Sequence, residues 1–213
     1  LRRKTPALFL DFDGTLSPIV RHIDRALLPK ESKRLLQELA GTFEGRVAIV
    51  SGRSLKDLKK KIGIKELIYV GNHGLEIQGP GLTFNKPGAG RSRKYLAALK
   101  GELTRALASI PGVLLEDKVL SMSLHYRMVR PKDIPEFERI AAGLIRPYAA
   151  GKQLKVSRGK KVFELKPAVN WYKGHAVLWL LKRLGHEKIF PIVVGDDLTD
   201  EDAFGAVRGK GLA

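Results

Sequence analysis

The chain has 213 residues, of which 44% are hydrophobic, enough for one large folded domain or two small ones. It contains no cysteine, which excludes disulfides, thiolate zinc sites and cysteine nucleophiles. No apolar run approaches the roughly 20 residues that span a bilayer, so we expect a cytoplasmic protein with no membrane partner.

The net charge of +17 is unevenly spread along the chain. Residues 80–160 hold 16 Lys or Arg and 6 Asp or Glu, a formal charge of +10, whereas residues 161–213 are almost neutral. Such charge attracts anions, whether nucleic acid, lipid or phosphorylated metabolites. The alternative interpretation is a lysine-rich solvated surface without a specific ligand.

The first third of the chain alternates between buried strands and amphipathic helices. Ala7–Asp11 is an apolar run without alternation, which is typical of a strand buried on both faces of a parallel sheet. A helix is predicted at 29–43, with Leu35, Leu36 and Leu39 on one side. A strand, a helix and a strand then follow at 46–51, 54–63 and 67–74. This alternation indicates right-handed crossovers and a parallel sheet.

The pattern changes in the middle of the chain. Residues 74–84 carry the glycines and proline of a hairpin, and a helix with one leucine stripe is predicted at 92–110. Residues 120–127 alternate strictly between apolar and polar side chains, as in a strand with one exposed face. A second helix and two short strands follow at 135–148, 154–157 and 161–167. Helices on one side of an alternating sheet make a small α+β domain, which we place at residues 79–160.

The last part of the chain again combines an amphipathic helix with a buried strand, as in the first third. A helix is predicted at 173–185 and a buried strand at 189–197, and Thr199 is a plausible N-cap for a final helix. The sequence therefore predicts an α/β protein. Its Rossmann-like, doubly wound parallel-sheet core comprises residues 1–78 and 161–213, and the smaller α+β domain is inserted between these segments.

The string "DFDGT" places two acids at the end of the first predicted strand, the edge at which open α/β sheets bind ligands. Asp11 could attack phosphorus and form an aspartyl-phosphate, while Asp13 could protonate the leaving oxygen. A carboxylate that attacks a phosphate needs a cation between them, and Mg²⁺ suits oxygen ligands. Gly14 and Thr15 would then contact substrate. The alternative is two loop acids that cap the next segment.

Two further signals occupy equivalent places along the chain. Ser51 ends a buried strand just before a helix, so its hydroxyl could hold phosphate oxygens or simply cap the helix. Lys173 lies at a helix start, where the helix dipole disfavours a cation unless an anion is nearby. It could neutralise both a phosphate and Asp11, although an ordinary surface lysine is the simpler interpretation.

Five acids occur within the seven residues from Asp196 to Asp202, directly after an apolar strand. Without a cation these carboxylates would repel one another. A bound metal ion would offset that repulsion, with Asp196 as a ligand and with Asp197 and Asp200 orienting waters or ligands. Acids that favour the helix dipole explain the later members of the run but not the first two.

The order of these four strings, over nearly the whole chain, resembles the haloacid dehalogenase superfamily of phosphotransferases. The resemblance implies that Asp11 is the nucleophile and Asp13 the general acid and base. It also implies that the Asp13 carbonyl and Asp196 complete a Mg²⁺ site with Asp11. The inserted α/β segment corresponds to the superfamily's cap domain.

Further strings resemble the trehalose-6-phosphate phosphatase family: "SGR", "GNHGLE", "LEDKVLSMSLHYR", "VFELKP" and "GDDLTDEDAF". The resemblance implies a Mg²⁺-dependent phosphatase that converts trehalose 6-phosphate to trehalose and phosphate through an aspartyl-phosphate. It further implies that Glu116, Lys118 and Glu164 contact the sugar. In that family another strand and a helix follow the fourth motif, whereas this sequence ends soon after it.

Two residues within these strings each allow two interpretations. His73, in "GNHG", is either a hinge or substrate contact or a loop histidine. Arg53, in "SGR", either helps to bind the anion or is a solvated charge.

Other functions remain open at this point. One is a phosphatase for another sugar phosphate, such as a glucosyl- or mannosyl-phosphoglycerate or sucrose 6-phosphate. Another, prompted by the net charge, is a nucleic-acid-binding or end-phosphate-processing domain, although aromatics are only 7% and no basic-aromatic RNA motif appears. A third is a noncatalytic regulatory domain of a larger protein. We favour a monomer with a small-molecule partner.

Overall fold

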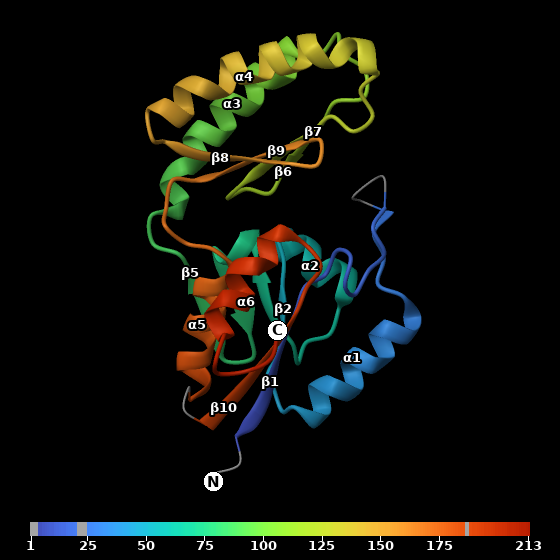
Figure 1. Cartoon of the computed structure of the whole chain (residues 1–213), viewed down its shortest axis with the longest axis vertical. Helices are drawn as coiled ribbons and strands as arrows, with labels where there is room; N and C mark the ends of the chain where they lie inside the picture. Colours follow the sequence, from blue (N-terminus) through green and yellow to red (C-terminus); the bar gives the residue numbers. More distant parts are fainter. Residues whose placement is uncertain (1–3, 21–24, 186–187) are drawn as a thin grey trace. The chain divides into compact units, whose positions relative to one another are not determined.

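The computed structural model describes residues 4–20, 25–185 and 188–213, so the start of the basic N-terminal stretch lies outside the described residues (Figure 1). The chain divides into two compact units. The core unit comprises Leu1–Lys86 and Trp171–Ala213, and the inserted unit comprises Pro87–Asn170. Among the described residues, no helix is both long and apolar enough to cross a membrane.

The core unit contains a six-stranded sheet of strand order β10-β1-β2-β3-β4-β5. Four strands run parallel: β1 (Thr5–Leu10), β2 (Val47–Val50), β3 (Ile68–Gly71) and β10 (Ile189–Val194). Two more add antiparallel at one edge: β4 (Glu76–Gly79) and β5 (Leu82–Asn85). Because β2 and β3 have helices on both faces, every residue in them is buried, and this explains their unbroken apolar runs.

Helices cover both faces of this sheet (Figure 1). The core-unit helices are α1 (Lys30–Thr42), α2 (Leu55–Ile62), α5 (Lys173–Leu184) and α6 (Glu201–Val207), with short 3₁₀ turns η2 (Asn72–Gly74) and η6 (Leu198–Asp200). One hydrophobic cluster lies between the sheet and α5 with α6, and a second lies between the sheet and α1 with α2. The predicted doubly wound core is confirmed.

Two local predictions in the core unit were wrong. Leu35 is 55% exposed, because the buried stripe of α1 passes through Leu36 and Ala40 instead. Thr199 is not the N-cap of the last helix. The chain first makes the 3₁₀ turn η6, which the Asp197 side chain caps by accepting a hydrogen bond from the backbone N–H of Leu198, and α6 begins only at Glu201.

The inserted unit has a four-stranded antiparallel sheet of order β6-β7-β9-β8, and the described part of the unit packs its helices on that sheet. The strands are β6 (Leu114–Asp117), β7 (Met122–His125), β8 (Leu154–Gly159) and β9 (Val162–Pro167). The helices are α3 (Arg93–Ala106) and α4 (Ile134–Ala150), each preceded by a 3₁₀ turn, η3 (Ala89–Ser92) and η4 (Pro131–Asp133). The predicted leucine stripe of α3 is buried against Phe137 and Phe163. The exposed face predicted for residues 120–127 is wrong for Ser121, which precedes β7, and for Ser123 within it, because both are buried.

The unit boundaries lie further along the chain than the predicted insert of residues 79–160. The β4–β5 hairpin pairs with β3 and packs Ile77 in the core cluster, so it belongs to the core unit. Strand β9 pairs with β7 and β8 up to Pro167, which keeps that stretch in the inserted unit. The composition of the hairpin gave no signal of which sheet it would join.

Candidate active site

Three of the predicted site residues follow neighbouring parallel strands at the same edge of the core sheet. Asp11 comes directly after β1, Ser51 directly after β2, and Asp196 two residues after β10. Strand β1 pairs with both β2 and β10, so the three loops lie side by side. Lys173, the first residue of α5, reaches the same place, since its side chain bonds to Asp11.

Lys173 links two carboxylates inside the core unit. Its Nζ donates a hydrogen bond of 2.7 Å to Asp11 Oδ1 and another of 2.7 Å to Asp200 Oδ1. All three side chains are buried, with only 3% of the Lys173 side chain exposed. Burial by itself lowers the pKa of Lys173, but the two carboxylates outweigh it and raise that pKa, so the group is an ammonium ion.

Asp11 is the less well compensated partner of this ion pair. Burial raises its pKa to about 6, which the Lys173 ammonium only partly opposes and which the neighbouring Asp200 and Asp13 reinforce. Lys173 has two anionic neighbours, whereas Asp11 has one cation and two acids nearby. The asymmetry explains why both pKa values rise, and it indicates a site with surplus negative charge.

A group of three carboxylates could hold a metal ion. Oxygens of Asp11, Asp196 and Asp200 all lie within 4.8 Å of one another. Burial, together with Asp197 and Asp200, raises the pKa of Asp196, so the ionised carboxylates destabilise one another. An all-oxygen, acidic set of donors fits Mg²⁺.

Two glycines make room for these carboxylates. A Cβ at Gly14 would collide with the Asp196 carboxylate, and one at Gly195 would collide with Asp200. Gly14 also has a φ of +97°, a left-handed conformation that side chains other than glycine rarely adopt. Gly14, which we predicted as a substrate contact, therefore has a steric role next to Asp196, and the neighbouring Thr15 is half-buried.

The Asp13 carboxylate is held by Arg53, whose guanidinium is buried. Arg53 Nε donates to Asp13 Oδ2 at 2.7 Å, and Nη2 donates to Oδ1 at 2.7 Å, a bidentate fork. The remaining nitrogen, Nη1, donates to Asp57 Oδ2 at 2.6 Å. Arg53, expected to bind an anion or lie in solvent, thus orients a predicted acid. Sequence reasoning missed Asp57, although its spacing of four residues from Arg53 was a usable signal.

The remaining predicted core residues have clear positions. Ser51 is buried, and its Oγ accepts a hydrogen bond of 3.2 Å from the backbone N–H of Arg53. The imidazole of His73 lies against Gly52, since a Cβ on Gly52 would fall 2.5 Å from the ring.

The backbone N–H of Asp197 donates to Asp200 Oδ2 at 3.3 Å, so Asp197 supports the position of Asp200. Asp200, predicted to orient ligands, itself belongs to the carboxylate group.

The inserted unit holds its own polar cluster, formed by the three predicted sugar contacts and two neighbours. Lys118 Nζ lies 3.5 Å from Glu116 Oε2 and 3.8 Å from Glu164 Oε2. His125 Nε2 lies 3.2 Å from Glu116 Oε2, and Ser123 Oγ donates to Glu164 Oε1 at 2.8 Å. Burial alone would raise the pKa of Glu116, but His125 and Lys118 lower it, so its carboxylate stays ionised.

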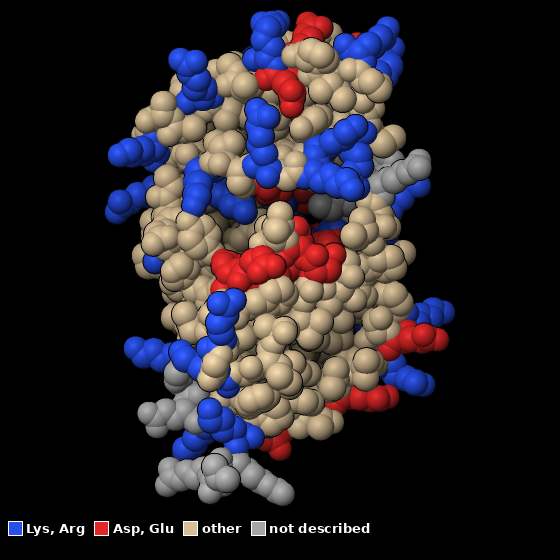
Figure 2. Space-filling view, in the orientation of Figure 1, with Lys and Arg blue, Asp and Glu red and all other residues tan. Residues whose placement is uncertain are grey.

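The surface charge differs between the two units. Figure 2 shows acidic side chains gathered over the start of α6 in the core unit, and it shows Lys and Arg spread over the inserted unit. The exposed acids of the loop after β10 and of α6 include Asp196, Asp197, Glu201 and Asp202.

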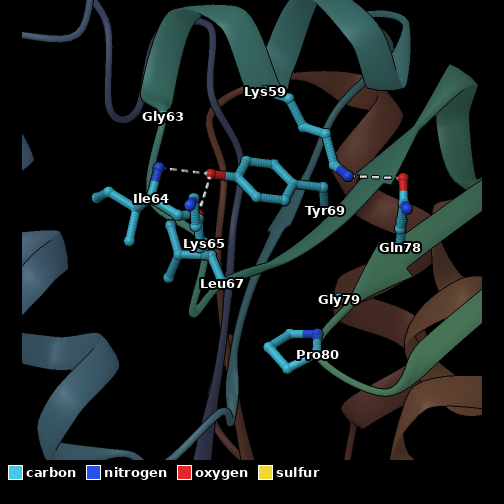
Figure 3. A pocket seen from close by; sticks show the side chains of 9 residues that line it. All are labelled: Lys59, Gly63, Ile64, Lys65, Leu67, Tyr69, Gln78, Gly79 and Pro80. Atoms are coloured by element: carbon cyan, nitrogen blue, oxygen red, sulfur yellow. Dashed lines mark hydrogen bonds between the residues drawn. The ribbon is translucent and has the colours of Figure 1, made fainter.

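A hollow elsewhere on the core unit is separate from this site (Figure 3). It has a volume of about 380 Å³ and lies beside the C-terminus of α2, where Tyr69 and Pro80 line it. The Tyr69 hydroxyl is satisfied by the backbone of Ile64, and Lys59 donates to Gln78. None of the predicted site residues lines this hollow.

Comparison with known proteins agrees with this geometry. The family model described as trehalose-phosphatase matches residues 9–211. The chain is 37% identical to the probable trehalose-phosphate phosphatase J of Arabidopsis thaliana over 223 aligned positions, which cover 99% of the chain and 59% of that protein. Across three curated relatives it spans 53% to 59% of their length.

Solved structures give the same result. The C-terminal domain of the C. albicans trehalose-6-phosphate phosphatase is 26% identical, with a TM-score of 0.79 over 97% of this chain and 73% of that one. A haloacid dehalogenase-like hydrolase from B. subtilis, 18% identical with a TM-score of 0.55 over 94% of this chain and 86% of that one, shares the fold. The chain therefore belongs to the trehalose-phosphatase family.

Proposed function

We propose that this chain is a Mg²⁺-dependent phosphatase unit that hydrolyses trehalose 6-phosphate to trehalose and phosphate. The observation that carries the proposal is the Lys173 ammonium, buried between Asp11 and Asp200 where β1 ends and α5 begins. The names of its relatives supply the substrate. The mutual pairing of Asp11, Lys173 and Asp200 argues against a purely regulatory domain, because buried ionised groups with perturbed pKa values cluster at functional sites.

In the proposed reaction, Asp11 attacks phosphorus and the bond from phosphorus to the sugar oxygen breaks. Asp13, protonated on one oxygen while the other still accepts from Arg53, gives that proton to the sugar oxygen, so trehalose leaves and Asp11 carries the phosphoryl group. Asp13 then takes a proton from water, which attacks the phosphorus; the bond from phosphorus to the Asp11 oxygen breaks, and phosphate leaves. Lys173 and Ser51 hold phosphoryl oxygens throughout. Mg²⁺, held by Asp11, Asp196 and Asp200 with the Asp13 carbonyl, would supply charge neutralisation.

The sugar contacts are proposed to come from the inserted unit. Glu116 and Glu164 are acceptors for sugar hydroxyls, and Lys118 is a donor between them. Their mutual pairing supports this role, since it holds three flexible side chains in one geometry before the sugar arrives. His73, half-buried against Gly52, is proposed to position the Ser51 loop rather than to bind substrate.

Phosphate release from a panel of sugar phosphates tests the proposed function. With Mg²⁺ present we expect the largest kcat/KM for trehalose 6-phosphate, because the strings of both units match that family. Sucrose 6-phosphate and glucosyl- or mannosyl-phosphoglycerate serve as the competing substrates. A larger kcat/KM for any of these would reject the substrate while leaving the phosphatase chemistry in place.

Chelation provides a further prediction. EDTA should abolish turnover, and added Mg²⁺ should restore it, since one ammonium cannot neutralise three carboxylates and a phosphate. Mg²⁺ should also raise the melting temperature of wild-type protein but not of Asp196→Asn, which removes one donor. Full turnover in EDTA would contradict the proposed role of the metal.

Charge steering is a separate prediction. The positive charge of residues 80–160 should attract the anionic substrate, so kcat/KM should fall as NaCl rises from 50 to 500 mM, while kcat changes little. A neutral osmolyte matched for viscosity serves as the control. If kcat/KM is independent of salt, this charge has no steering role.

A further inference from the structure

The loop Ser51–Arg53 carries two of the proposed functional side chains, and a neighbouring turn holds its backbone. The N–H of His73 donates to the carbonyl of Ser51 at 3.0 Å, and the N–H of Asn72 donates to the carbonyl of Arg53 at 2.7 Å. The carbonyls at the two ends of the loop thus accept hydrogen bonds from two consecutive residues of η2.

This pairing requires an unusual backbone. Asn72 and His73 both have left-handed conformations, with φ values of 49° and 56°. Residues other than glycine rarely adopt this conformation, and two in succession persist only where the surroundings impose it. Asparagine is among the side chains that tolerate it best.

A carboxylate braces this turn at Asn72. Glu76 Oε1 accepts a hydrogen bond of 2.6 Å from Asn72 Nδ2 and another of 3.1 Å from the backbone N–H of Leu55. Asn72 is fully buried, and Leu55 is the first residue of α2. Glu76 therefore ties the turn that holds the loop to the helix that follows the loop.

The consequence reaches the proposed acid. Arg53 is the last residue of the loop Ser51–Arg53, and its guanidinium donates hydrogen bonds to both oxygens of Asp13. A shift of the Arg53 backbone would move its guanidinium and with it the Asp13 carboxyl, the proposed proton donor to the leaving oxygen. We infer that Glu76 and Asn72 are positioning residues that act through Arg53 on proton transfer to the leaving group. This inference rests on the proposed phosphatase function.

The dependence on leaving group tests this inference. The value of kcat/KM reports the steps up to and including transfer of the phosphoryl group to Asp11. In that transfer a poor leaving group, such as a sugar alkoxide, needs a proton from the general acid, whereas 4-nitrophenolate leaves without one. For Glu76→Ala we expect kcat/KM to fall roughly 10- to 100-fold with trehalose 6-phosphate and with phenyl phosphate, but less than about threefold with 4-nitrophenyl phosphate. Asn72→Gly, which keeps the left-handed backbone but loses the amide, should behave in the same way.

Two controls separate positioning from general damage. Glu76→Gln keeps an oxygen acceptor at the same place and should retain most activity. Gln78→Ala removes the other side-chain hydrogen bond between β4 and α2, that of Gln78 with Lys59, and should leave kcat/KM unchanged for every substrate. Equal losses for all substrates in Glu76→Ala, or no loss at all, would overturn the inference.

The same assays keep the two proposals distinct. If the wild-type protein cleaves the aryl phosphates but not trehalose 6-phosphate, the proposed substrate fails, while the aryl pair still decides the role of Glu76. If it cleaves trehalose 6-phosphate and Glu76→Ala shows no leaving-group dependence, only the positioning inference fails.

Discussion

Asp11→Asn is expected to lower phosphate release by at least about a thousandfold, because the amide cannot attack phosphorus. The fold should remain intact, since asparagine has almost the same shape and can still accept a hydrogen bond from Lys173. Asp133→Asn, which removes a half-buried carboxylate that pairs with Arg130 in the inserted unit, should keep wild-type activity. Retained turnover in Asp11→Asn would refute the nucleophile.

The same substitution has a stability signature. Burial raises the folded-state pKa of Asp11 from 3.8 to about 6, so the folded protein binds this proton more tightly than the unfolded chain does. The ionised carboxylate therefore destabilises the fold progressively as pH rises from about 4 to above 6, by up to about 3 kcal/mol. In EDTA, Asp11→Asn should melt above the wild type at pH 7.5, and the difference should vanish near pH 4.

Lys173→Met is expected to be the most destabilising change in the site. It leaves Asp11 and Asp200 buried without their common cation, and breaking a buried ion pair in this way costs about 3–5 kcal/mol. The melting temperature in EDTA should fall by on the order of 10 °C at pH 7.5. Activity should be lost as well, because the ammonium is also proposed to bind the phosphate.

The pH dependence of this loss identifies its cause. Without Lys173 the pKa of Asp11 should rise further, so protonation near pH 5 should recover part of the stability. Lys182→Met, in the exposed last turn of the same helix, should change the melting temperature little at either pH. A pH-independent loss in Lys173→Met would point to a packing defect rather than to unpaired carboxylates.

Much of the fold was predictable because its strands are buried on both faces. A short unbroken run of β-branched and other apolar residues, such as Val47–Val50, favours a strand that is buried on both faces. Helices that alternate with such strands then indicate a parallel sheet. The predicted boundary at residue 79 divided the β4–β5 hairpin between the two units, because its pattern specifies a hairpin but not its partner strand. That partner, β3, is chosen by packing of Ile77 in the core.

The candidate site was predictable where function follows from a strand end. Asp11, Ser51 and Asp196 each follow a buried strand, so the topology alone brings them to one edge. The roles of Asp200 and Arg53 depend on loop geometry after β10 and β2, which no periodicity encodes. The left-handed turn at Asn72 and His73 likewise leaves no sequence pattern beyond the asparagine itself.

Trapping of the covalent intermediate tests the central claim most directly. Protein turning over trehalose 6-phosphate with Mg²⁺ would be quenched in acid and reduced with borohydride, which converts an aspartyl-phosphate to homoserine, and then mapped by peptide mass spectrometry. We expect homoserine at position 11, dependent on substrate and absent in Asp11→Asn. Turnover without homoserine at position 11, or homoserine at another aspartate, would contradict attack by Asp11.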